Sequence, residues 1–428
     1  MYFRPASGRT PCRWSLRPVD KHPRAAHACR QAWMEYRMLK KTLLAAALLA
    51  GFAAAGAARA ETSITLYGIV DAGYGYQNYK YDRGGADATA KSSGLRDGTL
   101  NGSRFGLKGS EDLGDGLRAI FQLEQGFDIG TGQSSSDRQF HRQAFAGLSS
   151  DAWGSLTMGR QYSAGVDTFL VDNGFNMGDA DKVFGSMGMN EGNRVDNSFK
   201  YTTPSLSGFQ AIVMYGTGDS GRLTADGYAA SATVGRANGV SFDDRGSRVS
   251  LGLLYAGGSI SAGASYDRQS VYGDDIGGGD ASAATNWQIN GSYDFEVVKL
   301  SLAYGQDRHG KIGWGGSVED FADFEGLGLG NFFGTDFKSN NYHVGLSAPV
   351  AGGTLYAGWG YSTSNADDLA PGGAAGDLSG SISTYHLNYM YPLSKRTSVY
   401  AYGTYGRNLA YVRDLKGTEA GVGLSHSF

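Results

Sequence analysis

Apolar and polar positions alternate through most of the segment 63–79, SITLYGIVDAGYGYQNY. One parity holds Ile64, Leu66, Val70, Ala72, Tyr74 and Tyr76. The other parity holds Thr65, Tyr67, Asp71, Gly73, Gly75 and Gln77. This period of two predicts a β-strand, and its length exceeds the roughly 5 or 6 residues usual in soluble proteins. Such a strand suits a tilted crossing of a bilayer.

The same alternation recurs along the chain, for example at 101–109 and 117–127, with turn signals between the segments. Seven short turns are predicted at 111–116, 150–154, 204–208, 257–259, 296–299, 349–353 and 392–396. Eight long polar connections are predicted at 80–97, 129–137, 163–193, 218–246, 271–284, 308–336, 364–380 and 407–416.

Seven short turns alternating with eight long connections predict an all-β fold of about sixteen antiparallel strands, with both ends on the short-turn side. In hydrocarbon every backbone N–H and C=O must be paired within the protein, so the sheet must close into a transmembrane β-barrel. A soluble β-sandwich or β-helix is the alternative. The alternation of long and short connections counts against it, as do the export signal and the missing cysteines described next.

The only long apolar run, 43–58, follows Lys40 and Lys41 and ends at Ala58-Arg59-Ala60. A basic start, an apolar middle and an A-x-A end indicate a secretory signal peptide at 38–60 that is cleaved after Ala60. Met38 is then the expected initiator, residues 1–37 an annotation extension or cleaved leader, and 61–428 the barrel domain.

Composition sharpens this picture once residues 1–60 are set aside. Both cysteines, Cys12 and Cys29, lie in that part, so no disulfide framework is expected in the barrel. Of 38 Lys+Arg and 41 Asp+Glu, 27 and 39 remain, a formal net charge of −12 that argues against a nucleic-acid partner. Gly 67 in 428 residues is about twice the usual share, which fits a chain with many turns.

One stretch departs from the pattern. Residues 163–193 carry acids, glycines and methionines without a helical or a strand period, between the predicted strands 154–162 and 194–203. Loops of this length are uncommon in compact proteins and are usually functional or disordered. By the count of turns it is the third external loop.

Parity on the neighbouring strands predicts which charges face the lumen. Arg104 and Lys108 oppose Phe105 and Leu107, so both are predicted to point inward. The same argument places Arg118 and Glu124 inward, and also Arg194, Asp196 and Lys200, which oppose Val195, Phe199 and Tyr201. Arg142 is ambiguous by parity. Arg160 shares parity with Leu156 and Met158 and is predicted to stay out of the pore.

Motifs for catalysis or metal binding find no support. The segment 305–311 fits G-x4-G-K, but Ile312 stands where a phosphate-binding loop needs Ser or Thr. The five histidines after residue 60 form no i, i+4 pair or Cys/His cluster, so no metal, no cofactor and no enzymatic activity is expected. A hydrolase site that uses His386, on a predicted strand, is the remaining enzymatic alternative.

By its ordered motifs the sequence resembles the general porins of Gram-negative outer membranes, most closely the β-proteobacterial branch. The motifs are SITLYGIVDAG, SRFGLKGSEDLGDGL, RQAFAGLS, GSLTMGRQY, KYTTPSLSGF and the terminal Phe428. The resemblance covers nearly all of 61–428. It implies a homotrimer of sixteen-stranded barrels in the outer membrane, in contact with outer-membrane lipid and lipopolysaccharide and inserted by the barrel assembly machinery, with Phe428 as the assembly signal.

The resemblance also implies that the third external loop folds into the lumen, and that Arg142 points inward, with Ala144 and Ala146 leaving room for that loop. The expected constriction then has a basic wall and an acidic side. The basic wall is Arg104, Lys108, Arg142 and Arg194. The acidic candidates are Glu124, Asp167, Asp172, Asp179, Asp181 and Glu191.

These expectations describe a passive diffusion channel for small hydrophilic solutes and ions. The alternatives are a substrate-specific porin, and a surface structural or adhesin barrel whose external loops do the work. The net charge favours cations, whereas the arginine cluster favours anions. Charge at the narrowest point should outweigh distant loop acids, because exposed charges are screened beyond about 8 to 10 Å.

Overall fold

The computed structural model describes residues 62–83, 86–136, 138–169, 194–217, 247–269, 283–309, 311–312, 332–333, 336–368 and 378–428. The chain divides into two compact units, Met1–Arg59 and Ala60–Phe428. All described residues belong to the second unit. The predicted extension, signal peptide and cleavage site therefore lie outside the described residues.

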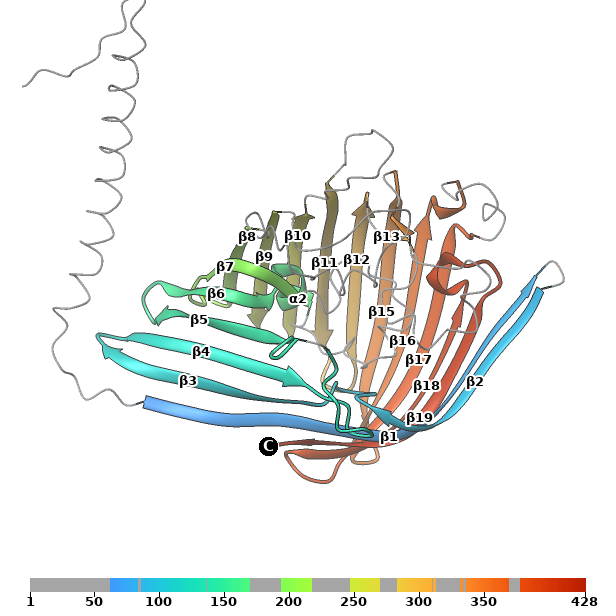
Figure 1. Cartoon of the computed structure of the whole chain (residues 1–428), viewed down its shortest axis with the longest axis horizontal. Helices are drawn as coiled ribbons and strands as arrows, with labels where there is room; N and C mark the ends of the chain where they lie inside the picture. Colours follow the sequence, from blue (N-terminus) through green and yellow to red (C-terminus); the bar gives the residue numbers. More distant parts are fainter. Residues whose placement is uncertain are drawn as a thin grey trace, which may run out of the picture. The chain divides into compact units, whose positions relative to one another are not determined.

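The second unit is almost entirely β-structure (Figure 1). Its strands in the first half are β1 Thr62–Arg83, β2 Ala86–Asp97, β3 Arg104–Gly114, β4 Leu117–Gly126, β5 Gln143–Ser150, β6 Gly154–Tyr162, β7 Arg194–Thr202 and β8 Phe209–Gly216. The second half holds β9 Arg248–Gly257, β10 Ile260–Gln269, β11 Ala284–Asp294, β12 Lys299–Arg308, β15 Lys338–Val350, β16 Gly353–Ser364, β17 Ser381–Pro392, β18 Thr397–Arg407 and β19 Lys416–Ser427. A separate small hairpin pairs β13 Lys311–Ile312 with β14 Phe332–Phe333. The helical elements are α2 Ala164–Phe169, η5 Ala366–Asp368 and η6 Leu409–Tyr411.

Neighbouring strands pair antiparallel in chain order, and β19 returns to pair with β1, so the sheet closes. The first half of β1 pairs with β3 and its second half with β2, so β2 and β3 together occupy one strand position. The barrel therefore has sixteen positions, which confirms the predicted fold class and strand number. Closure removes every free sheet edge from the hydrocarbon region.

All seven predicted short turns join the expected strands, but one predicted long connection is wrong. The segment 80–97 is mostly strand, because β1 continues to Arg83 and β2 pairs with it from Ala86. Its polar composition hid the strand period. The sequence breaks instead at 98–103, where the buried carboxylate of Asp71 accepts hydrogen bonds from the Asn101 amide at 3.1 Å and from Tyr400 Oη at 2.6 Å.

Alternation sorts side chains between the two faces of the wall. On β9 and β11, Leu251 and Ile289 are 41% and 52% exposed, whereas their neighbours Ser250 and Gln288 are 0% and 1% exposed. The apolar face is the outer one, and the buried polar face lines the lumen. Among the described residues, no helix combines the length and apolar character that a membrane-spanning helix requires.

The start of the third external loop lies against the lumenal face of the barrel. Helix α2 leaves β6 and packs on β9, β10 and β11 (Figure 1). Ser250 Oγ accepts from the Ala164 amide at 2.8 Å, and Gln288 Nε2 donates to the Gly165 carbonyl at 2.9 Å. Since Ser250 and Gln288 belong to the buried polar face, this part of the loop folds inward.

The two ends of the barrel sheet meet at Phe428 and Gly68. Each backbone amide donates to the other residue's carbonyl, at 3.0 and 3.1 Å. A Cβ at position 68 would lie 2.4 Å from the Phe428 ring and 2.6 Å from the Arg104 carbonyl, so only glycine fits here.

Candidate functional site

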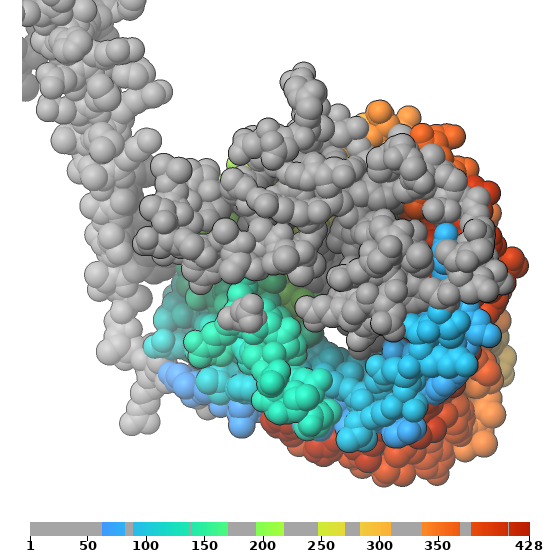
Figure 2. Space-filling view, turned by 45° about the vertical axis from the view of Figure 1, so that its right-hand side comes forward, coloured from blue at the N-terminus to red at the C-terminus, as the bar shows by residue number. Residues whose placement is uncertain are grey.

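A cluster of arginines, tyrosines and one glutamate lies on the lumenal face of β1 and β3–β7. We call it the arginine cluster: Tyr67, Arg104, Glu124, Arg142, Tyr162 and Arg194. Figure 2 shows the surface hollowed between the blue N-terminal strands and the green segment near residue 140.

Arg104 and Glu124 reach the cluster by simple strand alternation. On β3, Phe105 and Leu107 are 43% and 40% exposed on the outer face, which places Arg104 and Lys108 on the lumenal face. Gly106 lies opposite Glu124, so the glutamate shares that face. Arg104 Nε donates to the Gly102 carbonyl at 3.0 Å.

Arg142 lies one residue before β5, which explains its ambiguous parity. Its backbone amide donates to the Glu124 carbonyl, and its Nε lies 2.7 Å from Glu124 Oε1. Both side chains are largely buried, at 14% and 6% exposure. A buried, hydrogen-bonded ion pair of this kind fixes the guanidinium in place, and breaking it leaves an uncompensated charge.

Tyr162 joins two of the arginines. Its hydroxyl oxygen accepts from Arg142 Nη2 at 3.1 Å and from Arg194 Nη2 at 2.5 Å. The Arg194 guanidinium also lies over the Tyr162 ring, 4.4 Å from its centre, in cation–π geometry.

A β-bulge lies between β6 and β7 and alters the predicted parity there. Val195 and Ser198 face Gln161 and Gly159, so β7 carries one extra residue. Val195 was predicted to face outward with Phe199 and is instead buried at 7%, against 48% for Phe199. The lumenal position of Lys200 therefore cannot be used to place Arg194 by alternation. Arg194 belongs to the cluster because it contacts Tyr162.

The bulge also brings Arg160 and Asp196 together, although alternation had assigned them to opposite faces. Arg160 forms an ion pair with Asp196, and Arg138 pairs with the other carboxylate oxygen of Asp196 at 2.5 Å. Arg160 Nε also donates to the His141 carbonyl. These ion pairs border the arginine cluster.

Ala144 and Ala146 were expected on the lumenal face and are not there. Ala144 lies opposite Leu123, and Ala146 lies opposite Phe121 and Met158. Met158 is 50% exposed on the outer face, so both alanines share that face. The error arose because Arg142 was given the parity of the strand that follows it, although it precedes that strand.

Tyr67 and Tyr162 are the residues that the sequence did not reveal. Tyr67 Oη donates to Glu124 Oε2 at 2.9 Å and accepts from Gln122 Nε2 at 2.6 Å. Lys108 Nζ lies 5.4 Å from the centre of the Tyr67 ring, at the edge of the cluster. In the sequence, Tyr67 alternates in step with the polar positions of β1. This was the one signal that could have placed it on the lumenal face.

The acidic candidates fall into three groups. Glu124 lies within the arginine cluster as the counter-ion of Arg142. Asp167, on α2, pairs with Lys200 Nζ at 2.9 Å. Burial raises the pKa of the Asp167 carboxyl, and the Lys200 charge opposes that rise. Asp172, Asp179, Asp181 and Glu191 lie outside the described residues.

Positive charge dominates the arginine cluster. Three guanidinium groups face a single carboxylate, and their field extends to His141 in the connection before β5. Burial first, and then the charges of Arg142, Arg194 and Arg160, lower the pKa of His141 to about 4. In the part of the chain that the structure describes, no group of three or more His, Cys, Asp or Glu is arranged to hold a metal ion. The excess of positive charge in the cluster attracts anions.

Comparisons with known proteins agree with this geometry. Residues 45–410 match the family model described as Gram-negative porin. An outer membrane porin of Bordetella pertussis is 42% identical over 410 residues, covering 91% of this chain and 100% of the relative. Outer membrane porin protein 32 of Delftia acidovorans is 30% identical, covering 90% of this chain and 92% of the relative.

A solved structure named as an anion-selective porin from Comamonas acidovorans shares the fold, with a TM-score of 0.60 at 23% identity. The match covers 86% of this chain and 100% of that one. The closed sixteen-stranded barrel, the inward α2 and the family match lead to one conclusion: the chain belongs to the Gram-negative porin family and is a porin of the outer membrane.

Proposed function

We propose that the barrel is a general diffusion channel for small hydrophilic solutes and ions, and that the arginine cluster forms the basic wall of its constriction. The observation that carries the proposal is the meeting of Arg104, Arg142 and Arg194 around Glu124 and Tyr162, on the lumenal face. Fixed charges at a narrow, low-dielectric opening act on passing solutes more strongly than charges in bulk water.

We infer that the channel prefers anions. The cluster carries more positive than negative charge, and Lys108 adds a further cation at its edge. Loop acids more than a Debye length away are screened, so the local excess decides the selectivity. The porin from Comamonas acidovorans with the same fold is named as anion-selective.

The third external loop would supply the opposite side of the constriction. Its first turn already lies on the far inner wall, held by Ser250, Gln288 and the Asp167–Lys200 pair. Asp172, Asp179, Asp181 and Glu191, further along that loop, are the candidates to face the arginines. Solutes would then pass between a basic wall and an acidic loop.

The remaining partner assignments rest on family membership. The chain would assemble as a homotrimer, contact outer-membrane lipid and lipopolysaccharide, and be inserted by the barrel assembly machinery, which would read Phe428. No catalytic step belongs to the proposal, since porins are channels.

The placement of the basic wall can be tested by removing two of its charges. Arg104→Ala combined with Arg142→Ala should lower the anion-to-cation permeability ratio several-fold, because Glu124 then remains without its main counter-ion. Reversal potentials across planar bilayers under a salt gradient measure this ratio.

The matched control is Lys395→Ala with Arg396→Ala, which removes the same net charge in the exposed short turn between β17 and β18. It should leave the ratio unchanged. Equal shifts in both double variants would refute the assignment of a constriction wall to the cluster. A wild-type protein that forms no open channel, or opens only after loop removal, would instead favour the adhesin alternative. Saturable flux or block by one solute would indicate a substrate-specific porin.

A further inference from the structure

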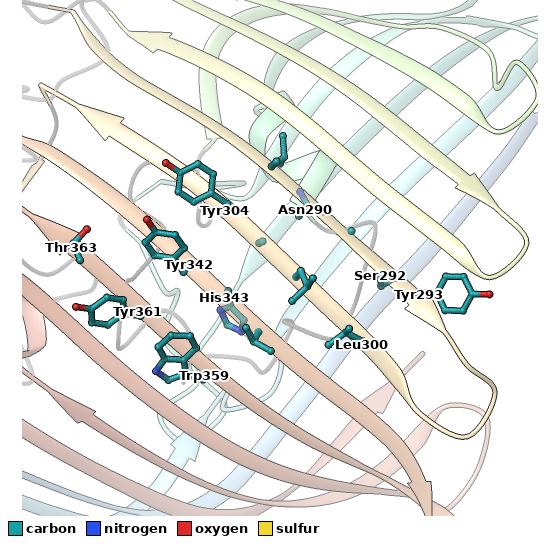
Figure 3. Close-up of a pocket in the computed structure, with 15 residues that line it drawn as sticks. Asn290, Ser292, Tyr293, Leu300, Tyr304, Tyr342, His343, Trp359, Tyr361 and Thr363 are labelled. Carbon is teal, nitrogen blue, oxygen red and sulfur yellow. The ribbon is translucent and has the colours of Figure 1, made fainter.

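Two histidines from different strands meet on the lumenal wall of the barrel. His343 lies on β15 and His386 on β17, and their ring centres are 5.5 Å apart. Both are buried, at 4% and 6% exposure, whereas their chain neighbours Tyr342 and Tyr385 are 39% and 48% exposed on the outer face. Figure 3 shows His343 next to Tyr342 on β15. Sequence spacing could not reveal the pair, because only the sheet brings β15 and β17 to either side of β16.

Glycines of β16 make room for the two rings. Gly358 lies directly opposite His386, and Gly360 lies opposite His343. A Cβ at position 358 would collide with His386 Nε2, so the imidazole occupies the space that a side chain there would fill. The ring of His386 therefore leans over β16, toward His343.

The spacing of the rings fits two ligands of one metal ion. Imidazole nitrogens bind Zn²⁺ at about 2.0 to 2.1 Å in tetrahedral geometry. Since a ring nitrogen lies about 1.2 Å from its ring centre, two imidazoles on one such ion have ring centres about 5 Å apart. The observed 5.5 Å is close to this value. Rings that merely pack together have similar spacing, so the surroundings must distinguish the two cases.

The surroundings of the histidine pair suit a cation. The lumenal positions of β15, β16, β17 and β18 are all described, and none of them carries Lys, Arg, Asp or Glu. Hydroxyl and amide groups lie beside the rings instead. Thr404 lies opposite His386, and Asn341 precedes His343 by two residues on the same face. No basic side chain of this wall therefore repels a metal ion, in contrast to the arginine cluster on the wall around β3–β7.

The pair also lies beside the segment that enters the lumen. Ala303 of β12 lies directly opposite His343. Phe169, the last residue of α2, packs against Ala303. An ion held by the pair would thus lie next to the start of the third external loop, where it takes up part of the opening.

We propose that His343 and His386 bind a divalent transition-metal ion that prefers imidazole ligands, such as Zn²⁺, and that the bound ion lowers conductance. Imidazole suits Zn²⁺, Cu²⁺ and Ni²⁺, whereas Mg²⁺ and Ca²⁺ prefer oxygen ligands. Water would complete the coordination, since among the described residues no third His, Cys, Asp or Glu joins the pair. The inference goes beyond the proposed diffusion function, because it adds a ligand that the lumen itself holds.

Removing one ligand at a time tests the site. His343→Gln and His386→Gln each keep a neutral polar side chain, and either should weaken Zn²⁺ binding at least tenfold. Loss of even an outer-shell partner of a metal ligand costs about 10- to 100-fold in affinity. Isothermal titration calorimetry of the folded barrel in detergent measures the affinity, with Mg²⁺ as the comparison ion. His426→Gln is the matched control, because that imidazole lies on β19 near the short turns, where its Nδ1 bonds Thr397 at 2.9 Å.

Electron paramagnetic resonance of bound Cu²⁺ identifies the ligands directly. With less than one Cu²⁺ per chain, the wild type should show coupling to two imidazole nitrogens, and each single variant to one at most. Absence of Zn²⁺ binding, equal affinity for Mg²⁺, or equal losses in His426→Gln would overturn the proposal. Heat-modifiable gel mobility checks that each variant folds. If neither folds, the wild-type Cu²⁺ spectrum decides, and coupling to fewer than two nitrogens would overturn the proposal.

Single-channel recording tests the effect on passage. Saturating Zn²⁺ should lower the conductance of the wild type and of His426→Gln, with recovery on chelation, and leave His343→Gln and His386→Gln unchanged. Unaltered wild-type conductance with Zn²⁺ bound would overturn the placement of the ion at the opening. A barrel that binds Zn²⁺ but never conducts counts against the diffusion channel alone, whereas an open channel without Zn²⁺ binding removes the metal site alone.

Discussion

At the residue scale, Tyr162 explains how like charges remain close together on the lumenal wall. One hydroxyl oxygen accepts from two guanidinium groups, and the ring beneath accepts the cation–π contact of Arg194. Glu124 neutralises Arg142 from the other side. Hydrogen bonds to charged groups contribute about 1.5 to 3 kcal/mol each, enough to hold guanidinium groups in fixed positions against their mutual repulsion.

His141 lies beside these arginines, and burial first and then their charges lower its pKa. Its pKa of about 4 means that the folded protein keeps the imidazole neutral where the unfolded chain, with a pKa near 6.5, already binds a proton. The contribution to stability is thus fully present above pH 6.5 and is lost as the pH falls from 6.5 toward 4. His141→Asn should flatten this part of the profile of unfolding free energy against pH, measured by urea titration in detergent. An unchanged profile would contradict the burial of a neutral His141 beside the arginines.

At the scale of elements, α2 is held against the wall by close backbone approach as well as by hydrogen bonds. A Cβ at Gly263 would lie 2.4 Å from the Thr168 carbonyl oxygen, which is too close for any side chain. Glycine at this position of β10 is therefore what lets the third loop start flat on the inner wall. Ser163 supports the first turn, since its Oγ accepts from the Val166 amide at 3.3 Å.

Gly263→Ala should push α2 away from β10 and so change the opening that the loop narrows. We expect altered single-channel conductance with an intact barrel, because β10 keeps its strand pairing. Single-channel recording together with circular dichroism checks both parts. Gly94→Ala on β2 is the matched control, because a Cβ there meets nothing within 4 Å. Identical conductance in wild type and Gly263→Ala would show that this contact does not position the loop.

The same elements show where reasoning from sequence succeeds. Arg104 and Glu124 lie on uninterrupted strands, so a period of two was enough to place them. A bulge at Gly159 and Asn197, whose φ angles are +134° and +49°, separates Arg194 from Lys200 on β7. The inserted residue means that strand alternation counted from Lys200 gives the wrong face for Arg194. Tyr162 stayed unnoticed because its partners, Arg142 and Arg194, lie 20 and 32 residues away in sequence, on either side of β6, so alternation along one strand could not reveal the contacts.

At the scale of the whole molecule, a Phe428 variant can separate barrel closure from the proposed assembly signal. Its backbone pairs with Gly68, and the residue is 42% exposed. Phe428→Ala keeps the backbone pairing and removes the ring. We expect it to refold from urea almost as wild type does, yet to give several-fold less folded barrel in cells, judged by heat-modifiable gel mobility.

Ser427→Ala serves as the control in both settings, because Ser427 is exposed and its backbone amide, which donates to Arg396, is retained. Equal cellular yields of the Phe428→Ala and Ser427→Ala variants would remove the assembly role from the ring. Equal failure of Phe428→Ala in refolding and in cells would assign the residue to barrel closure alone.

Barrel closure also sets the order of folding events. Gln77 donates to Glu419 across 342 positions of sequence, and Tyr400 donates to Asp71 across 329. Hairpins between adjacent strands form between near neighbours, but these contacts must first overcome the entropy of closing almost the whole chain into a loop. We therefore expect the β1–β19 seam to form last, and until it forms the sheet has two unpaired edges.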